Sequence, residues 1–397
     1  MTNEPTRGDG DVPAAAAQAL GDIEPALLED WFRTRYFDAR IDISSSGMQN
    51  YSLGRLRAML GIDVADLDRL PFRDSPSLGC EPLRAAIAAR YAPTRPERVM
   101  VTHGSTEGIF LALSAVVRPG DEVVVLSPVY QSLSSVAAAL GARLRVWRLS
   151  GEQDFEPDLA HLAALITPKT RAVVVNFPHN PTGAMPDLDG YHRLLAMVEQ
   201  AGCYLFWDAA FGELVYERSP LPDPAGFLDR CVSFGTMSKA FGLPGLRIGW
   251  CVAPQDVLAA MVRLRDYVTI STSPLNELLA TRVMERVDTV VGPLREQARF
   301  NRLLLTSWAA EHAGLVRLPL PHGGVSAFPA FPGVDDTVAL CDKLLDEHGV
   351  LLVPGVCFGH PDRVRLGFGG PTQDLQDGLA AVARAVGELS RPALDVR

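Results

Sequence analysis

Short apolar runs recur along the chain and are separated by stretches with helical periodicity. Runs of three to five residues are too short for buried helices and are typical of strands covered on both faces. Because they alternate with helices, the pattern predicts an α/β fold with a mostly parallel central sheet. The predicted strands cover residues 99–101, 123–126, 172–175, 204–207 and 248–252.

The alternation of short apolar runs and helices ends at about residue 285. A long charged helix, residues 294–308, precedes a strand, a helix, two strands and a last helix, which predicts a smaller α+β domain. We therefore expect four parts: a flexible N-terminus, a segment that packs with the small domain, a large domain and the small domain itself. Their expected boundaries are 1–20, 21–60, 61–284 and 285–397.

Charge and cysteine content exclude several classes of function. The 397 residues include 37 Lys and Arg against 47 Asp and Glu, whereas nucleic acids and acidic membranes require a basic face. The six scattered cysteines form no CxxC pair, which favours free thiols over disulfides or a metal site. No secretory signal is recognisable, and no run approaches the ~18 apolar residues of a membrane span. We expect a cytoplasmic protein without nucleic-acid or membrane partners.

Only three lysines occur in the chain. Lys169 and Lys343 lie in polar, surface-like contexts, whereas Lys239 stands among small residues and hydroxyls, eight positions before Arg247. Hydroxyls and an arginine together suit a phosphate. A lysine in an apolar, cationic setting has a lowered pKa, which makes its amine a nucleophile toward aldehydes. The alternative is a loop lysine that is exposed to solvent.

The segment 233–250, which contains Lys239, resembles the Schiff-base segment of fold-type I pyridoxal-phosphate enzymes, the aspartate-aminotransferase superfamily. Further motifs follow in the order and spacing of that family, from about residue 40 to about residue 390. The resemblance implies an aspartate-aminotransferase-like fold and a large domain that binds pyridoxal 5'-phosphate through Lys239. It also implies a small amino-acid substrate and a homodimer with shared active sites.

A phosphate cradle is predicted where residues 99–101 give way to a helix. Free amides, hydroxyls and the positive helix end there favour an anion, although an ordinary helix N-cap would have the same composition. The resemblance implies that the cofactor phosphate is held by Gly104, Ser105, Thr106, Thr236, Ser238 and Arg247.

Four further residues match family positions around the cofactor ring and the substrate. Tyr130 would stack on the ring, and Asn180 would donate a hydrogen bond to the phenolic oxygen; a core tyrosine and an Asn-Pro turn are the alternatives. Asp208 ends an apolar strand, where a carboxylate is costly unless paired. The resemblance pairs Asp208 with the pyridinium nitrogen, so that the ring accepts electrons. Arg365 would grip the substrate carboxylate, although an alternating surface strand gives the same pattern.

Two positions depart from an ordinary transaminase. Phe211 replaces the usual tyrosine that bonds the phenolic oxygen, so we expect the cofactor linkage to titrate at a raised pKa. Asp74 replaces a tyrosine that, in relatives, reaches across the dimer to the phosphate. A carboxylate would repel a phosphate, so Asp74 is expected to face a cationic group on the substrate, unless it is a solvated loop residue.

The third departure is the run Ser44, Ser45 and Ser46, whose donors and acceptors suit a guanidinium side chain. With the motifs around Asp74, Asn180 and Asp208, this run resembles the cyclases of capreomycidine and streptolidine formation, which act on β-hydroxylated arginines. The resemblance implies β-elimination of the hydroxyl followed by intramolecular guanidine addition, in peptide-antibiotic or streptothricin-type biosynthesis.

Two other functions are considered. An ordinary class I/II aminotransferase would share every cofactor residue. A cofactor-sensing regulator would carry a basic helix-turn-helix domain before this fold, whereas residues 1–40 are acidic and rich in alanine.

Overall fold

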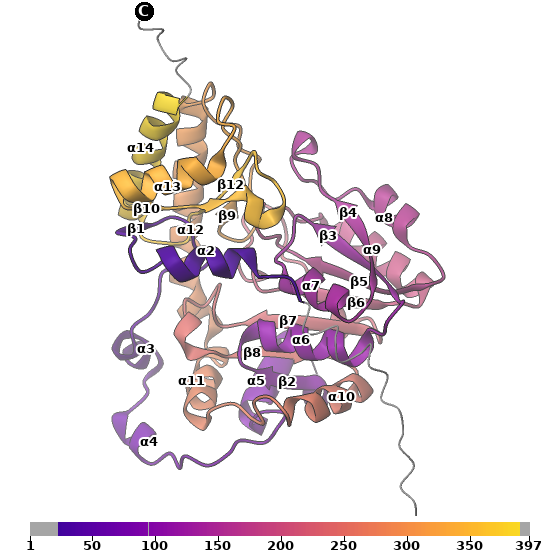
Figure 1. Ribbon diagram of the computed structural model, residues 1–397. Coiled ribbons are helices and arrows are strands. Elements are labelled where there is room, and N and C mark those ends of the chain that lie inside the picture. The colour runs from indigo at the N-terminus through magenta and orange to yellow at the C-terminus, as the bar shows by residue number, and fades with distance from the viewer. Residues whose placement is uncertain (1–22, 94, 390–397) are drawn as a thin grey trace, which may run out of the picture.

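The computed structural model describes residues 23–93 and 95–389 (Figure 1). The predicted flexible segment 1–20 lies outside these residues. No helix of the described ranges is both long and apolar enough to cross a membrane.

A seven-stranded sheet forms the centre of the large part, in the order β2-β8-β7-β6-β5-β3-β4. The strands β3 to β7 run parallel, and β8 is antiparallel to both β2 and β7. The prediction of a mostly parallel sheet is therefore confirmed. The strands are β2 (Val99–Thr102), β3 (Glu122–Ser127), β4 (Arg143–Arg148), β5 (Thr170–Asn176), β6 (Tyr204–Asp208), β7 (Cys231–Thr236) and β8 (Gly249–Val252).

Both faces of this sheet are covered, as the continuous apolar runs require. Alternate residues of β3 enter different cores: Val123 and Val125 pack on one side, Val124 and Leu126 on the other. Helices connect the strands and supply the outer layers. They are α5 (Glu81–Tyr91), α6 (Gly104–Val116), α7 (Ser132–Ala139), α8 (Leu159–Leu165), α9 (Leu188–Ala201), α10 (Gln255–Arg265) and α11 (Pro274–Met284).

Local capping explains where several of these helices begin and end. The side chain of Asp187 accepts from the Gly190 amide at the start of α9, and Gly202 ends that helix with a φ of 63°. These are favourable N-cap and C-cap residues. Five short 3₁₀ turns join other elements, at Pro96–Arg98, Gly151–Gln153, Pro224–Gly226, Pro244–Leu246 and Gly355–Phe358.

The smaller part combines two small sheets with the C-terminal helices (Figure 1). One sheet pairs β1 (Ile41–Asp42) with β10 (Val350–Leu351) in parallel, which joins the N-terminal segment to this part. The other has the order β11-β12-β9. The remaining elements are α2 (Leu27–Arg35), α3 (Leu53–Leu60), α4 (Val64–Asp68), β9 (Ser326–Ala327), β11 (Val353–Pro354), β12 (Val364–Gly367), α12 (Val287–Glu311), α13 (Thr337–His348) and α14 (Thr372–Leu389).

Candidate active site

The polar residues of the site follow from where the parallel strands end. Asn176 ends β5, Asp208 ends β6 and Thr236 ends β7. Ligands bind beyond the carboxyl ends of such strands, and here a cavity of about 690 Å³ opens at that edge. The predicted residues that line it are Ser45, Ser46, Gly104, Ser105, Thr106, Tyr130, Asn180, Asp208, Phe211, Thr236, Ser238, Lys239, Arg247 and Arg365.

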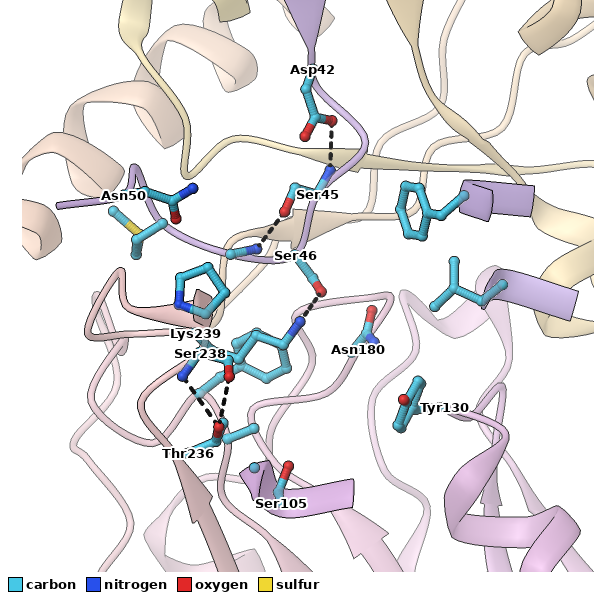
Figure 2. A pocket seen from close by; sticks show the side chains of 18 of the residues that line it. Asp42, Ser45, Ser46, Asn50, Ser105, Tyr130, Asn180, Thr236, Ser238 and Lys239 are labelled. Carbon is cyan, nitrogen blue, oxygen red and sulfur yellow. Dashed lines mark hydrogen bonds between the residues drawn. The ribbon is translucent and has the colours of Figure 1, made fainter. Parts of the chain in front are cut away.

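Lys239 lies in the middle of this cavity wall, in the loop after β7 (Figure 2). Its Nζ donates a hydrogen bond to Ser46 Oγ at 3.0 Å. Burial disfavours the charged amine and Arg365 adds repulsion, so the pKa of Lys239 falls to about 8. A much larger fraction of this amine is neutral near pH 7 than for an ordinary lysine. It is therefore a competent nucleophile and base.

Donors gather at the side of the cavity below Lys239 in Figure 2. Thr236 Oγ1 lies 3.1 Å from Ser238 Oγ, and Arg247 Nη2 donates to the carbonyl of His103 at 3.4 Å. Gly104 begins α6 with a φ of +74°, and a Cβ there would lie 2.8 Å from Arg247 Nη2. The positive φ favours glycine at this position, and the absence of a Cβ leaves room for the guanidinium of Arg247. The first amides of α6 have no intrahelical acceptor, which completes an anion cradle.

Asp208 is a buried carboxylate, with 5% of its surface exposed. Its Oδ1 accepts from the Ala210 amide at 3.0 Å. Burial raises the pKa of Asp208 to about 6, although that hydrogen bond and the charge of Lys239 act in the opposite direction. A cationic group placed against this carboxylate would offset the free-energy cost of its desolvation and keep it ionised.

Arg365 is also buried, with only 1% of its surface exposed. Its Nε and Nη2 donate to the carbonyl of Ser44, and its Nη1 donates to Asn180 Oδ1 at 3.3 Å. Burial lowers the pKa of Arg365 to about 10. Among the described residues, no carboxylate forms an ion pair with it. A buried guanidinium without a counter-ion is suited to a ligand carboxylate.

The three predicted serines play different roles. Ser46 contacts Lys239, and Ser45 Oγ accepts from the Gly47 amide at 3.1 Å. Ser44 is fully buried outside the cavity lining, and its hydroxyl donates to Asp42 Oδ1 at 2.6 Å. The structure thus places the carbonyl of Ser44, not its hydroxyl, next to a site residue. A direct contact between these serines and a substrate stays a prediction.

Asp74 lies apart from the cavity that contains Lys239 within the single chain. It lines a second hollow together with Ser75 and Glu277. Its predicted contact with a substrate therefore requires a second subunit and stays a prediction.

Several lining residues were missed by the sequence analysis. Glu29 and Phe32 come from α2, Asp42 from β1 and Asp374 from the first turn of α14. The sequence around these residues does not mark them as site residues, because an acidic residue on a charged helix is usually solvated. Asn176 could have been found, since it ends an apolar strand in the same motif as Asn180.

The arrangement fits pyridoxal phosphate. The anion cradle around Gly104 and Arg247 suits its phosphate, and the buried Asp208 suits its ring nitrogen. Lys239 is an amine with a lowered pKa on the same cavity wall, and Tyr130 and Phe211 supply aromatic faces. The Nδ2 group of Asn180 is free to donate, because its contact with Arg365 uses Oδ1.

Comparisons with known proteins agree with this geometry. Capreomycidine synthase of Streptomyces vinaceus is 52% identical over 95% of this chain and 97% of that protein. The arginine–pyruvate transaminase of Pseudomonas aeruginosa is 29% identical over 78% of this chain and 81% of that protein.

Solved structures show the same fold. The crystal structure of the PLP-dependent cyclase OrfR superposes with a TM-score of 0.88 at 43% identity, covering 92% of this chain and 97% of that one. A PLP-dependent aminotransferase from Streptococcus suis gives a TM-score of 0.89 at 27% identity, covering 94% and 100%. The family model for aminotransferase class I and II matches residues 74–382. The chain therefore belongs to the aminotransferase class I and II family and is a PLP-dependent enzyme.

Proposed function

We propose that this enzyme is a cyclase that converts a β-hydroxylated arginine to a capreomycidine-type cyclic guanidino amino acid, in peptide-antibiotic or streptothricin-type biosynthesis. The observation that carries the proposal is the 52% identity to capreomycidine synthase over nearly the whole of both chains. The likeness to the cyclase OrfR supports it. The site residues described above supply what the reaction needs.

The overall reaction involves no oxidant or reductant. The bond between the β-carbon and the hydroxyl breaks, a bond between the β-carbon and a guanidine nitrogen forms, and one water leaves. The cofactor, when bound, stores the electron pair that is released when the proton on the α-carbon is removed.

The chain's own residues bind the substrate and move protons. Arg365 holds the α-carboxylate, which fixes the orientation of the α-carbon. Lys239 Nζ removes the proton from the α-carbon and later returns one to it, since its lowered pKa suits both roles. The carboxylate of Asp208 keeps the ring nitrogen protonated. Ser46, 3.0 Å from Lys239 Nζ, positions that amine.

The ordinary aminotransferase is distinguished by its products. The holoenzyme would be incubated with 3-hydroxyarginine and pyruvate. The proposal predicts a cyclic product and no alanine, whereas alanine formed in step with an oxo acid would identify an aminotransferase instead.

The lowered pKa of Lys239 predicts the pH dependence of cofactor uptake by the apoenzyme. The deprotonated amine is the nucleophile, so uptake of pyridoxal phosphate should rise with pH, with a midpoint near 8. The measurement is the rate at which visible absorbance appears. Arg365→Gln removes the positive charge that repels the amine most strongly and should shift the midpoint upward. A wild-type midpoint near the ordinary lysine value of about 10.4 would contradict the assignment.

Phe211 predicts a second spectroscopic property. The side chain lines the same cavity as Asn180 and has no hydroxyl to offer to the cofactor's phenolic oxygen. In Phe211→Tyr a new donor would stabilise the deprotonated form, so the pKa of the visible cofactor band should fall by about one unit. The pH titration of that band measures the shift. An unchanged or higher pKa in the variant would show that position 211 does not face the phenolic oxygen.

We also propose that the enzyme is a cytoplasmic homodimer with shared active sites. Large exposed side chains on two loops support a dimer, because such side chains often lie in subunit interfaces. Phe72 is 81% exposed and Tyr267 is 93% exposed. The six cysteines are free, which supports a reducing compartment. Light scattering should give twice the chain mass of 42.9 kDa; a monomer that is fully active would contradict the shared site.

A further inference from the structure

Three carboxylates line the small-domain side of the cavity, and the reaction described above does not use them. Glu29 lies on α2, Asp42 ends β1 and Asp374 lies in the first turn of α14. Figure 1 shows α2 across the junction of the large and small parts. Figure 2 shows Asp42 beyond Ser45 and Ser46, on the side away from the anion cradle. Three separate elements thus bring acidic side chains to one wall.

These carboxylates lack counter-ions among the described residues. Glu29 Oε1 accepts from the Tyr130 hydroxyl at 3.2 Å, and Asp42 Oδ1 accepts from the amides of Ser44 and Ser45. The other oxygens of these two, and both oxygens of Asp374, receive no hydrogen bond from a described residue. Like charges gathered in this way repel one another, and a bound cation would relieve the repulsion.

Arg365 supplies a second sign of the ligand on the same side of the cavity, where its guanidinium lies over the ring of Phe32 at 5.7 Å. Arg365 is buried without a carboxylate partner and faces the cavity, so it marks where a ligand carboxylate binds. Lys239 marks where the α-amino group reacts. When an amino acid is held at these two points, its side chain remains free to contact the wall formed by Glu29, Asp42 and Asp374. That side chain must be cationic to match the wall.

Aromatic residues on α2 and at its C-cap indicate which kind of cation the wall would bind. Phe32 and Tyr36 line the cavity on the same face of the helix as Glu29, at the spacing of successive turns. A planar guanidinium stacks on aromatic rings and pairs with carboxylates through several donors, whereas an ammonium acts as a point charge.

We propose that Glu29, Asp42 and Asp374 bind the guanidinium of the substrate and set the preference for arginine-type side chains over neutral ones of equal length. This inference rests on the proposed function and names the residues that recognise the side chain. It places that recognition within one chain, on α2, β1 and α14.

A competing interpretation assigns these carboxylates a purely internal role. Glu29 and Asp42 also act on the charge of Arg365 from beyond ion-pair distance, and each favours its protonated form. If that were their only role, removing them would weaken the binding of every amino acid in the same proportion. The two interpretations therefore differ in the ratio between a cationic and a neutral ligand.

The test measures how the holoenzyme binds L-arginine and L-citrulline, by titrating the cofactor absorbance. Arginine lacks the β-hydroxyl that leaves, and citrulline carries a neutral urea in place of the guanidinium. The variants are Glu29→Gln and Asp374→Asn. Matched controls remove a charge from the same helices outside the cavity. They are Asp30→Asn, next to Glu29, and Asp377→Asn, one turn after Asp374.

We expect each cavity variant to lower the affinity for arginine about tenfold or more, because a charge-assisted hydrogen bond is lost. The affinity for citrulline should change less than about twofold, which also shows that the pocket is folded. Both controls should bind both ligands as the wild type does. Equal losses for the two ligands, or no loss for arginine, would overturn the inference. A wild type that prefers arginine yet forms no cyclic product would overturn the proposed function alone.

Discussion

Replacement of Lys239 by alanine will abolish the visible absorbance of the bound cofactor and lower the rate of cyclisation by about 10⁴-fold or more. The reason is that, in the proposed mechanism, this amine both attaches the cofactor and moves the proton on the α-carbon. No other lysine can substitute for it. Lys169 is exposed to solvent and does not line the cavity. Lys343 forms ion pairs with Glu347 and Glu388 on the surface.

The measurement combines the absorption spectrum, the product assay and circular dichroism. The matched control is Lys343→Ala, which removes an amine that is bound only to surface carboxylates. This control should retain the visible band and the activity, because surface pairs of this kind contribute little. A Lys239→Ala protein that is folded and still forms the visible band would show that the cofactor is attached elsewhere.

Replacement of Asp208 by asparagine will lower turnover by about 10³-fold while the cofactor stays bound. The proposed phosphate ligands Thr236, Ser238 and Arg247 are unchanged in this variant, and Lys239 is intact. A neutral amide, however, does not keep a positive charge on the ring nitrogen, so the electron pair from the α-carbon is stabilised less. The visible band measures cofactor binding, and single-turnover kinetics measure proton removal.

Asp223 provides the matched control for this substitution. Burial raises its pKa to about 6, as it does for Asp208, and its Oδ2 accepts from the Ser233 hydroxyl. It does not line the cavity. Asp223→Asn therefore makes the same chemical change in a similar environment, and turnover should remain near that of the wild type. Equal losses in both variants would indicate a general effect of replacing a buried carboxylate by an amide.

The strands that sequence reasoning identified are those that contain a run of consecutive apolar residues, most of them buried. The runs at β3, β5 and β6 are apolar throughout because helices cover both faces of the sheet. Two strands of the central sheet were missed. The strand β4 lies at the edge of the sheet and alternates arginines with apolar residues, which obscures it. The strand β7, with the sequence CVSFGT, is buried yet partly polar because it leads into the cofactor loop.

The same contrast holds within the site. Asp208 was predictable because it ends an apolar strand, where the fold gathers polar site residues. Lys239 was singled out by its small and hydroxyl neighbours, and Thr236 by the family resemblance, although the strand β7 before them was missed. Glu29 and Asp374 were not predictable, because only tertiary packing brings α2 and α14 to the cavity.

The orientation of Ser44 was also beyond sequence reasoning. A short-range hydrogen bond to Asp42 turns its hydroxyl away from the cavity.

The most direct test of the proposed cyclisation is mass spectrometry of the product formed from 3-hydroxyarginine labelled with ¹⁵N at every nitrogen. The account predicts a product that has lost one water and kept every labelled nitrogen, because the guanidine closes the ring and the α-amino group is returned. An oxo acid accompanied by labelled ammonia would contradict it.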